Sequence, residues 1–238
     1  MSLVSWELFN LSLYLLVSLS YGGSESTLSA ALKYFLLSAF STGMLLLGVL
    51  ILYGSSGCMH YDSVSLMQYY DNSVWIDVAY VLILGCLLFK VSAAPLHNWS
   101  PDLYDALPTS LTLWMAVVPK VAVLGFLGIL SCQDSSFLDL TSASVLAVAG
   151  VTSLIVGSLG MGSQLRIKRL LAYSGISHVG FMILALYCHD LVAYFSYIFV
   201  YAVTTVNVFV ILIALARYHR AEIIFVHQLS SSFVLNPY

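Results

Sequence analysis

The chain has 238 residues, of which 61% are hydrophobic and only 8% are charged, with a net charge of −3 and a mean hydropathy of +0.96. In soluble domains about a quarter of all residues are charged, so this composition excludes an ordinary soluble enzyme. The nearly neutral charge balance gives no support for a nucleic-acid partner. We therefore expect an all-α membrane protein.

Long apolar segments recur along the whole chain. A transmembrane helix needs about 20 mostly apolar residues to cross the hydrocarbon core of a bilayer. The segments that qualify are residues 3–21, 28–53, 74–94, 111–130, 138–162, 170–187 and 191–216. The first has no basic segment before it and contains a glutamate, so we interpret it as a retained span rather than a signal peptide. The sequence predicts about seven transmembrane helices in a single domain, 1–220, followed by a C-terminal surface segment, 221–238.

The basic residues predict the orientation of these spans. Of the eight Lys and Arg residues, three lie inside the spans, and the others lie in the connector 164–169 and after residue 216. With seven spans, that connector and the C-terminal tail are on the same side of the membrane. This asymmetry is the positive-inside pattern, so the basic side is the cytoplasm or the mitochondrial matrix.

The four cysteines are far apart and include no C-x-x-C pair. This spacing argues against a zinc site or an iron–sulfur cluster. We therefore expect no metal site in this chain.

Several ionisable side chains fall inside the predicted spans: Glu7, Lys33, Lys90, Lys120 and His178. A charged side chain at the centre of a bilayer costs about 2.5–3.5 kcal/mol on insertion scales, and such residues usually mark ion or proton paths. Burial disfavours the charged form of lysine and of glutamate alike. Groups of this kind can change protonation near neutral pH when a neighbouring charge changes, which suits a proton relay.

Each of these residues also has a structural interpretation. Lys33 and Lys90 lie near the ends of their apolar segments, so their amines can instead reach the basic side of the membrane. Glu7 can be neutral and simply hydrogen-bonded, and His178 can be a satisfied core histidine.

Lys120 is the most specific signal, because about ten apolar residues flank it on each side. It follows Pro119, which removes a backbone hydrogen bond and is expected to kink the helix. Backbone groups freed within a membrane must be satisfied by neighbours or water. The sequence therefore predicts a local wet pocket beside Lys120.

The third span ends in FKVSAAPLHNWSPDLYDALPTS. Pro95 is expected to break this helix and to place Lys90 and His97 on either side of irregular backbone. Broken helices at membrane depth are typical of transporter binding sites.

Two motifs at these positions closely resemble the subunit 2 family of respiratory complex I, the proton-pumping NADH:ubiquinone oxidoreductase. They are FKVSAAPLHNWSPDLYDALPTSLTLWMAVVPKVA (89–122) and QLRIKRLLAYSGISHVGFMIL (164–184). The resemblance covers nearly the whole chain and is weakest over 54–73 and after about residue 190. It implies an antiporter-like fold of two inverted five-helix repeats, each with one broken helix. Here the broken helix is expected near Lys90–His97, and the second inverted repeat is expected to be incomplete.

The resemblance also implies proton-transfer roles for six residues of this chain: Glu7, Lys33, Lys90, His97, Lys120 and His178. Within this set, Glu7 resembles the family's glutamate that pairs with the lysine of the broken helix, here Lys90. Lys120 resembles the central lysine of a proton path that runs along the membrane.

The function implied by the resemblance is that of a proton-translocating membrane-arm subunit. The resemblance implies that such a chain is part of an enzyme only as a subunit, with no cofactor and no redox centre of its own. NADH, FMN, the iron–sulfur clusters and ubiquinone bind other subunits of the family's complexes. The expected partners are the other membrane-arm subunits and membrane lipids. Either another polypeptide supplies the helices that the family has and this chain lacks, or the exit side of the proton path is lost.

The expected location is the mitochondrial inner membrane, with a bacterial plasma membrane as the alternative. Two further functions remain open on the sequence. One is a subunit of a Na⁺/H⁺ antiporter or a membrane-bound hydrogenase, which share the architecture. The other is a scaffold that anchors its neighbours and no longer pumps.

Overall fold

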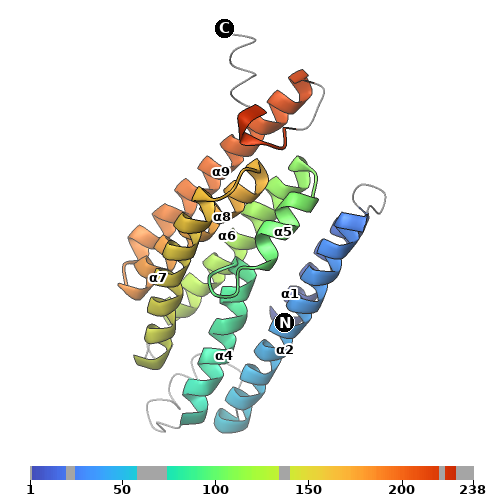
Figure 1. The fold of residues 1–238 in the computed structure, drawn as a ribbon. Coiled ribbons are helices and arrows are strands. Elements are labelled where there is room, and N and C mark those ends of the chain that lie inside the picture. Colours follow the sequence, from blue (N-terminus) through green and yellow to red (C-terminus); the bar gives the residue numbers. More distant parts are fainter. Residues whose placement is uncertain (1, 20–24, 58–73, 134–139, 220–222, 229–238) are drawn as a thin grey trace.

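A computed structural model describes residues 2–19, 25–57, 74–133, 140–219 and 223–228 of the chain. The helices lie side by side in an elongated bundle (Figure 1). The only β pairing in the described residues is one antiparallel bridge between Arg166 and Phe225. The predicted all-α class is confirmed.

The described helices agree with the predicted spans. They are α1 (Ser2–Leu19), α2 (Glu25–Ser56), α4 (Val74–Val91), α5 (Trp99–Ala106), α6 (Thr109–Gln133), α7 (Leu140–Gly162), α8 (Ile167–Tyr187) and α9 (Leu191–His219). Six of them, α2, α4 and α6 to α9, are long and apolar enough to cross a membrane, and α1 adds a shorter apolar stretch, Glu7–Leu19. The chain is therefore a multi-span membrane protein, as predicted.

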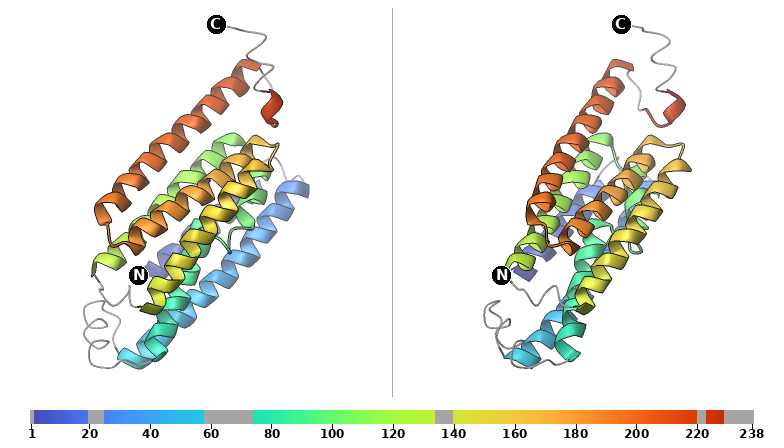
Figure 2. Two further views of the ribbon diagram at one scale, coloured as in Figure 1. Left: turned by 60° about the vertical axis from the view of Figure 1, so that its left-hand side comes forward. Right: turned by 90° about the vertical axis from the view of Figure 1, so that its left-hand side faces the viewer.

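The helices pack in neighbouring pairs, with α7 along α8, α2 along α4 and α6 along α9, while α1 lies against α2 (Figure 2). The approach of α7 to α8 is close enough to require glycine. A Cβ atom at Gly157 would lie 2.7 Å from the backbone nitrogen of Ser177, so no other residue fits there. Small residues at such contacts are typical of membrane helix packing.

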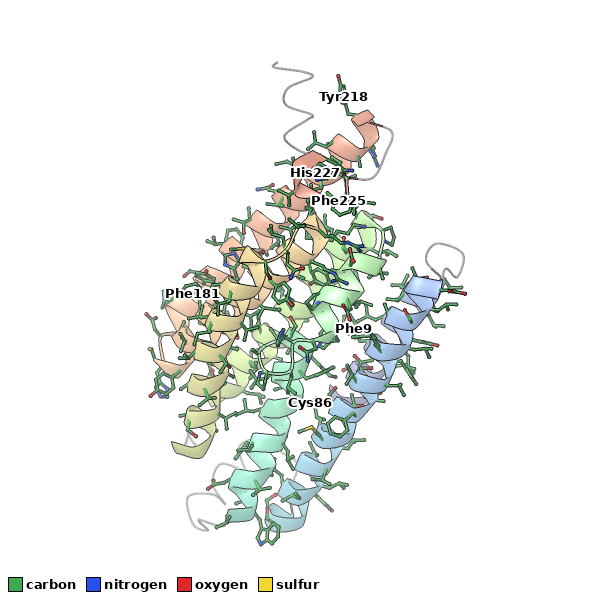
Figure 3. All side chains as sticks on the ribbon, viewed as in Figure 1. Phe9, Cys86, Phe181, Tyr218, Phe225 and His227 are labelled. Carbon is green, nitrogen blue, oxygen red and sulfur yellow. The ribbon has the colours of Figure 1, made fainter. Side chains whose placement is uncertain are left out.

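The outer faces of the bundle carry large exposed apolar side chains, among them Leu50, Leu159, Val192 and Phe199. In a soluble protein such a surface would aggregate, whereas lipid tails solvate it. Polar contacts instead gather inside the bundle and at its ends. Figure 3 shows Phe225 and His227 at the end where α9 finishes, while Cys86 is fully buried between α2 and α4.

The segment after α4 differs from the prediction in one respect. The predicted spans 74–94 and 111–130 leave residues 95–110 as a connector, but these residues contain α5, which begins after Asn98. Pro101 lies in the first turn of α5, where a helix needs no backbone N–H donor, so this proline does not prevent the helix.

The connector between α7 and α8 and the C-terminal tail share one end of the bundle. The backbone nitrogen of Ile167 donates to the carbonyl of Ile224, and that of Val226 to the carbonyl of Leu165, each over 3.0 Å. This placement agrees with the predicted common side for the two basic segments. The rest of the predicted surface segment 221–238, like Cys58, lies outside the described residues.

Candidate functional site

Lys90 lies in the last turn of α4, which stops midway along the bundle (Figure 1). The helix ends because Ser92 takes a left-handed backbone conformation, with φ of 64°. Ser92 and Ala93 donate backbone hydrogen bonds to Phe89 and Leu88, both over 2.9 Å, which is the Schellman pattern of a helix C-terminus. The partial negative charge of this helix end stabilises a cation in its last turn by about 0.3–1 kcal/mol. The fold thus places the largely buried Lys90 amine where its charge is tolerated.

Side chains of neighbouring helices contact the backbone around the break. The Trp99 indole N–H of α5 donates to the carbonyl of Phe89 over 3.1 Å. The Thr152 hydroxyl of α7 lies 3.2 Å from the carbonyl of Ala94 and 2.7 Å from that of Val148 on its own helix. The segment contains a cis peptide bond between Ala94 and Pro95. The predicted break of the helix between Lys90 and His97 is confirmed.

Lys120 lies in the interior of the bundle and is only 1% exposed. Helix α6 continues through Pro119, which leaves the carbonyl of Met115 without its usual helical donor. The Lys120 amine lies 5.7 Å from the centre of the Tyr104 ring, and no described group forms a hydrogen bond with it. A Cβ atom at Gly175 of α8 would lie 3.1 Å from the amine nitrogen. The glycine therefore leaves the space that the amine occupies.

Both buried lysines line a small cavity of about 20 Å³. It is lined by Phe9, Asn10, Leu13, Tyr34, Lys90, Trp99, Met115, Pro119, Lys120 and Val123. A volume of this size holds about one water molecule. The pocket predicted beside Pro119 and Lys120 is therefore present, and it extends to the broken end of α4.

His178 lies on α8, and the charge of Lys120 acts on it. The Nδ1 atom of His178 is 2.9 Å from the Tyr197 hydroxyl, and its ring centre is 5.7 Å from that of Tyr201. The Tyr201 hydroxyl donates to the carbonyl of Ala116 over 3.2 Å and so ties α9 to α6 beside Lys120. Tyr197 and Tyr201 thus place aromatic hydroxyls beside His178 and near Lys120.

Glu7 lies on α1, with an exposed side chain that acts electrostatically on Lys90. Four predicted site residues therefore follow one another across the bundle, and we refer to Glu7, Lys90, Lys120 and His178 as the polar row. The row crosses α1, α4, α6 and α8 in turn. Its members can exchange protons only through groups or water that lie between them.

Lys33 lies apart from the polar row. Its side chain is 62% exposed, and its amine lies 3.0 Å from the Asp102 carboxylate. Arg169 contacts Asp102 over 3.4 Å and Asp105 over 3.1 Å, and Arg166 also pairs with Asp105. This ion cluster joins α2, α5 and α8, and exposed pairs of this kind contribute about 0–1 kcal/mol each. The geometry matches the alternative in which Lys33 reaches the basic side, and its role in proton transfer stays a prediction.

His97 lies in the break after α4, with its ring centre 6.3 Å from that of Tyr173 on α8. It is half-buried and is not among the residues that line the cavity between the lysines. Its role in proton transfer also stays a prediction.

Comparison with known proteins identifies the family. The model of the NADH:quinone oxidoreductase/Mrp antiporter transmembrane family matches residues 1–234. The chain belongs to this family.

Similar members of the family are subunits of respiratory enzymes. NADH-ubiquinone oxidoreductase chain 2 of Rhizopus oryzae is 39% identical over an alignment of 249 positions, which covers 98% of this chain and 47% of the relative. NADH-quinone oxidoreductase subunit N of Hydrogenovibrio crunogenus is 36% identical and is matched over 89% of this chain and 45% of its own length. The chain spans less than half the length of these relatives.

Solved structures support the same antiporter-like fold. A chain of respiratory complex I from Thermus thermophilus is 34% identical, with a TM-score of 0.74, over 87% of this chain and 44% of that chain. The archaeal membrane-bound sulfane sulfur reductase matches with a TM-score of 0.81 over 90% of this chain and 44% of that chain, at 23% identity, which supports the fold alone.

The structure adds polar residues that sequence reasoning missed in this family member. Asn10 lines the cavity, and its position three residues after Glu7 places it on the same face of α1, a signal that the sequence offered. Lys168 served in the sequence only as one of the basic residues that predict the orientation of the spans. In the structure it is buried, and its amine donates to the carbonyl of Leu107, at the end of α5, over 2.6 Å. Tyr201 carried no signal in the sequence, because a tyrosine in a membrane helix is usually a packing residue.

Proposed function

We propose that this chain is a proton-translocating membrane-arm subunit of NADH:quinone oxidoreductase and that protons pass along the polar row. The observation that carries the proposal is the fully buried Lys120, which lines a cavity together with Lys90. A lysine kept in the interior without a hydrogen-bonding partner among the described groups has a large cost for staying charged. Its protonation therefore depends on the charge of its neighbours, as a relay requires.

The row provides successive proton acceptors. Glu7 acts on Lys90 through its charge, and Lys120 in turn acts on His178. When Lys90 gives up a proton to Lys120, the charge beside Glu7 falls and the charge beside His178 rises. Protonation of one member disfavours protonation of a like-charged neighbour, and in this proposal that repulsion drives transfer along the row. Tyr197 hydrogen-bonds to His178 and extends the row toward α9.

The rest of the proposal concerns the assembly. The relatives' names place them in NADH-quinone and NADH-ubiquinone oxidoreductases, so we propose other membrane-arm subunits as partners and redox chemistry in those other subunits. This chain itself would hold no cofactor. We propose the mitochondrial inner membrane as its location, because the fungal chain 2 matches 98% of this chain, with a bacterial plasma membrane as the alternative. The remaining helices of the family would come from a continuation of the chain or from a second polypeptide.

The test is the variant Lys120→Ala in the assembled complex, reconstituted in sealed vesicles. We expect fewer protons pumped per NADH oxidised, measured with a pH-sensitive dye, while NADH oxidation in the presence of an uncoupler persists. Val118→Ala is the matched control, because Val118 lies on the same helix with 40% exposure on its outer face. Unchanged pumping with intact assembly would instead support a scaffold, and pumping that requires Na⁺ would support an antiporter.

A further inference from the structure

Lys120 lacks the usual counterparts of a buried charge. Its side chain is 1% exposed, and among the described residues no carboxylate pairs with its amine. The carboxylates of Asp102 and Asp105 are instead engaged by basic side chains of α2 and α8. Taking an ammonium group out of water without an opposite charge nearby is unfavourable. A lysine that carries a proton in the relay therefore needs another group that stabilises its charge.

The aromatic ring of Tyr104 lies where such a group is needed. The Lys120 amine is over the face of this ring, 5.7 Å from its centre. Ring faces attract cations within about 6 Å of the centre, because the face of an aromatic ring is electron-rich. Tyr104 is only 2% exposed, so both partners are shielded from water. The attraction is strongest in such a desolvated site.

We propose that the face of the Tyr104 ring stabilises the positive charge of Lys120 and that Tyr104 is thus a positioning residue for the proton relay. The inference rests on the proposed function of the polar row and adds to it a residue that lies outside the row. The ring offsets only part of the cost of burying the charge, so the lysine can still release its proton. A carboxylate in the same place would hold the lysine charged, which would stop the relay.

The contacts of α5 keep the ring in this place. Tyr104 packs in one buried cluster with Ala116 of α6 and Phe209 of α9. Three residues further along the chain, the carbonyl of Leu107 accepts a hydrogen bond from the buried Lys168 amine over 2.6 Å. The ion cluster described above joins α5 to α2 and α8. The short helix that follows the break after α4 thus supports the ring from several sides.

The first test separates the ring of Tyr104 from its hydroxyl in the assembled complex. No described group forms a hydrogen bond with this hydroxyl, so Tyr104→Phe keeps the feature that the inference requires. We expect Tyr104→Phe to pump protons within about twofold of the parent, because a phenylalanine ring also attracts cations. Tyr104→Leu removes the ring and should slow NADH-driven proton pumping about tenfold or more, the loss of a desolvated cation–π contact. Tyr104→Met fills the same space flexibly and should be equally slow.

A double-variant cycle distinguishes a charge contact from simple packing. The melting temperature of this chain within the complex is measured for Tyr104→Leu, for Lys120→Leu and for the double variant. Loss of the ring should lower the melting temperature by about 4–8 °C more when Lys120 is present than when leucine replaces it. Tyr194→Leu is the control, because Tyr194 is fully buried and its ring contacts Phe195. Its effect should simply add to that of Lys120→Leu.

Three results would each overturn the inference: parent-like pumping by Tyr104→Leu, pumping by Tyr104→Phe as slow as that of Tyr104→Leu, or additive shifts in melting temperature for Tyr104 and Lys120. The amount of assembled complex is measured for every variant, and Tyr104→Met replaces Tyr104→Leu if the latter does not assemble. If Lys120→Ala slows pumping and Tyr104→Leu does not, the role of Tyr104 alone is wrong. If Lys120→Ala pumps normally while the cycle shows coupling, the ring contact stands and the proposed function is wrong.

Discussion

Replacing Lys120 by methionine should make the protein more stable and less active at the same time. The Lys120 side chain is 1% exposed, and its amine has no hydrogen-bonding partner among the described groups. An unsatisfied buried polar group costs about 1–3 kcal/mol, and the Tyr104 ring offsets only part of the cost of burying the charge. Methionine has a similar length, no polar hydrogen and a flexible shape that fits irregular space. We therefore expect the free energy of unfolding to rise by about 1–2 kcal/mol.

The assay follows the unfolding of this chain within the complex. Cys86 is fully buried, so its labelling by a thiol reagent on heating, read by mass spectrometry, reports the opening of the bundle. A gain of 1 kcal/mol corresponds to about 2–4 °C in melting temperature for a chain of this size. The control is Leu124→Met, one turn further along α6 at a buried apolar position, where the exchange is expected to cost less than about 1.5 kcal/mol.

The combination of results decides between two roles of the lysine. A structural lysine loses contacts on substitution, so the melting temperature of Lys120→Met would fall. A functional lysine is retained despite its cost, so the melting temperature rises while proton pumping falls. A lower melting temperature together with unchanged pumping would refute the reasoning that the buried amine is kept for proton transfer.

Two further predictions concern the neighbours of Lys120 in the polar row. Glu7→Ala and Lys90→Ala should each lower NADH-driven proton pumping. If the two residues act as a pair, the double variant should lose no more pumping than the more severe single variant. Fully additive losses would contradict the coupling. Gly175→Ala should slow pumping several-fold, because the new Cβ atom would lie 3.1 Å from the Lys120 amine and would displace it. Gly125→Ala is the control and should pump normally, because no atom lies within 4 Å of its Cβ position. Equal pumping by the two glycine variants would show that the position of the amine is not critical.

The sequence determined the spans, the helix break and the depth of Lys120. Apolar length alone separates a membrane helix from a connector, because about 20 residues are needed to cross the bilayer. The break near Pro95 and the central position of Lys120 follow from local chemistry, which needs no knowledge of neighbouring helices. The α5 helix was not predicted, because its short, polar segment resembles a connector and the sequence alone does not show that Pro101 lies in the first turn of a helix.

Only the tertiary structure decided which ionisable residues come together. In a membrane helix both the lipid and the protein interior are apolar, so hydropathy does not show which face points inward. Lys33 looked like the other buried lysines, but it pairs with Asp102, which lies 69 residues away in the sequence. Asn10 looked like a minor polar residue, yet the packing of α1 against its neighbours places it at the cavity of Lys90 and Lys120. Contacts between helices distant in sequence, rather than patterns within one helix, thus determine the site.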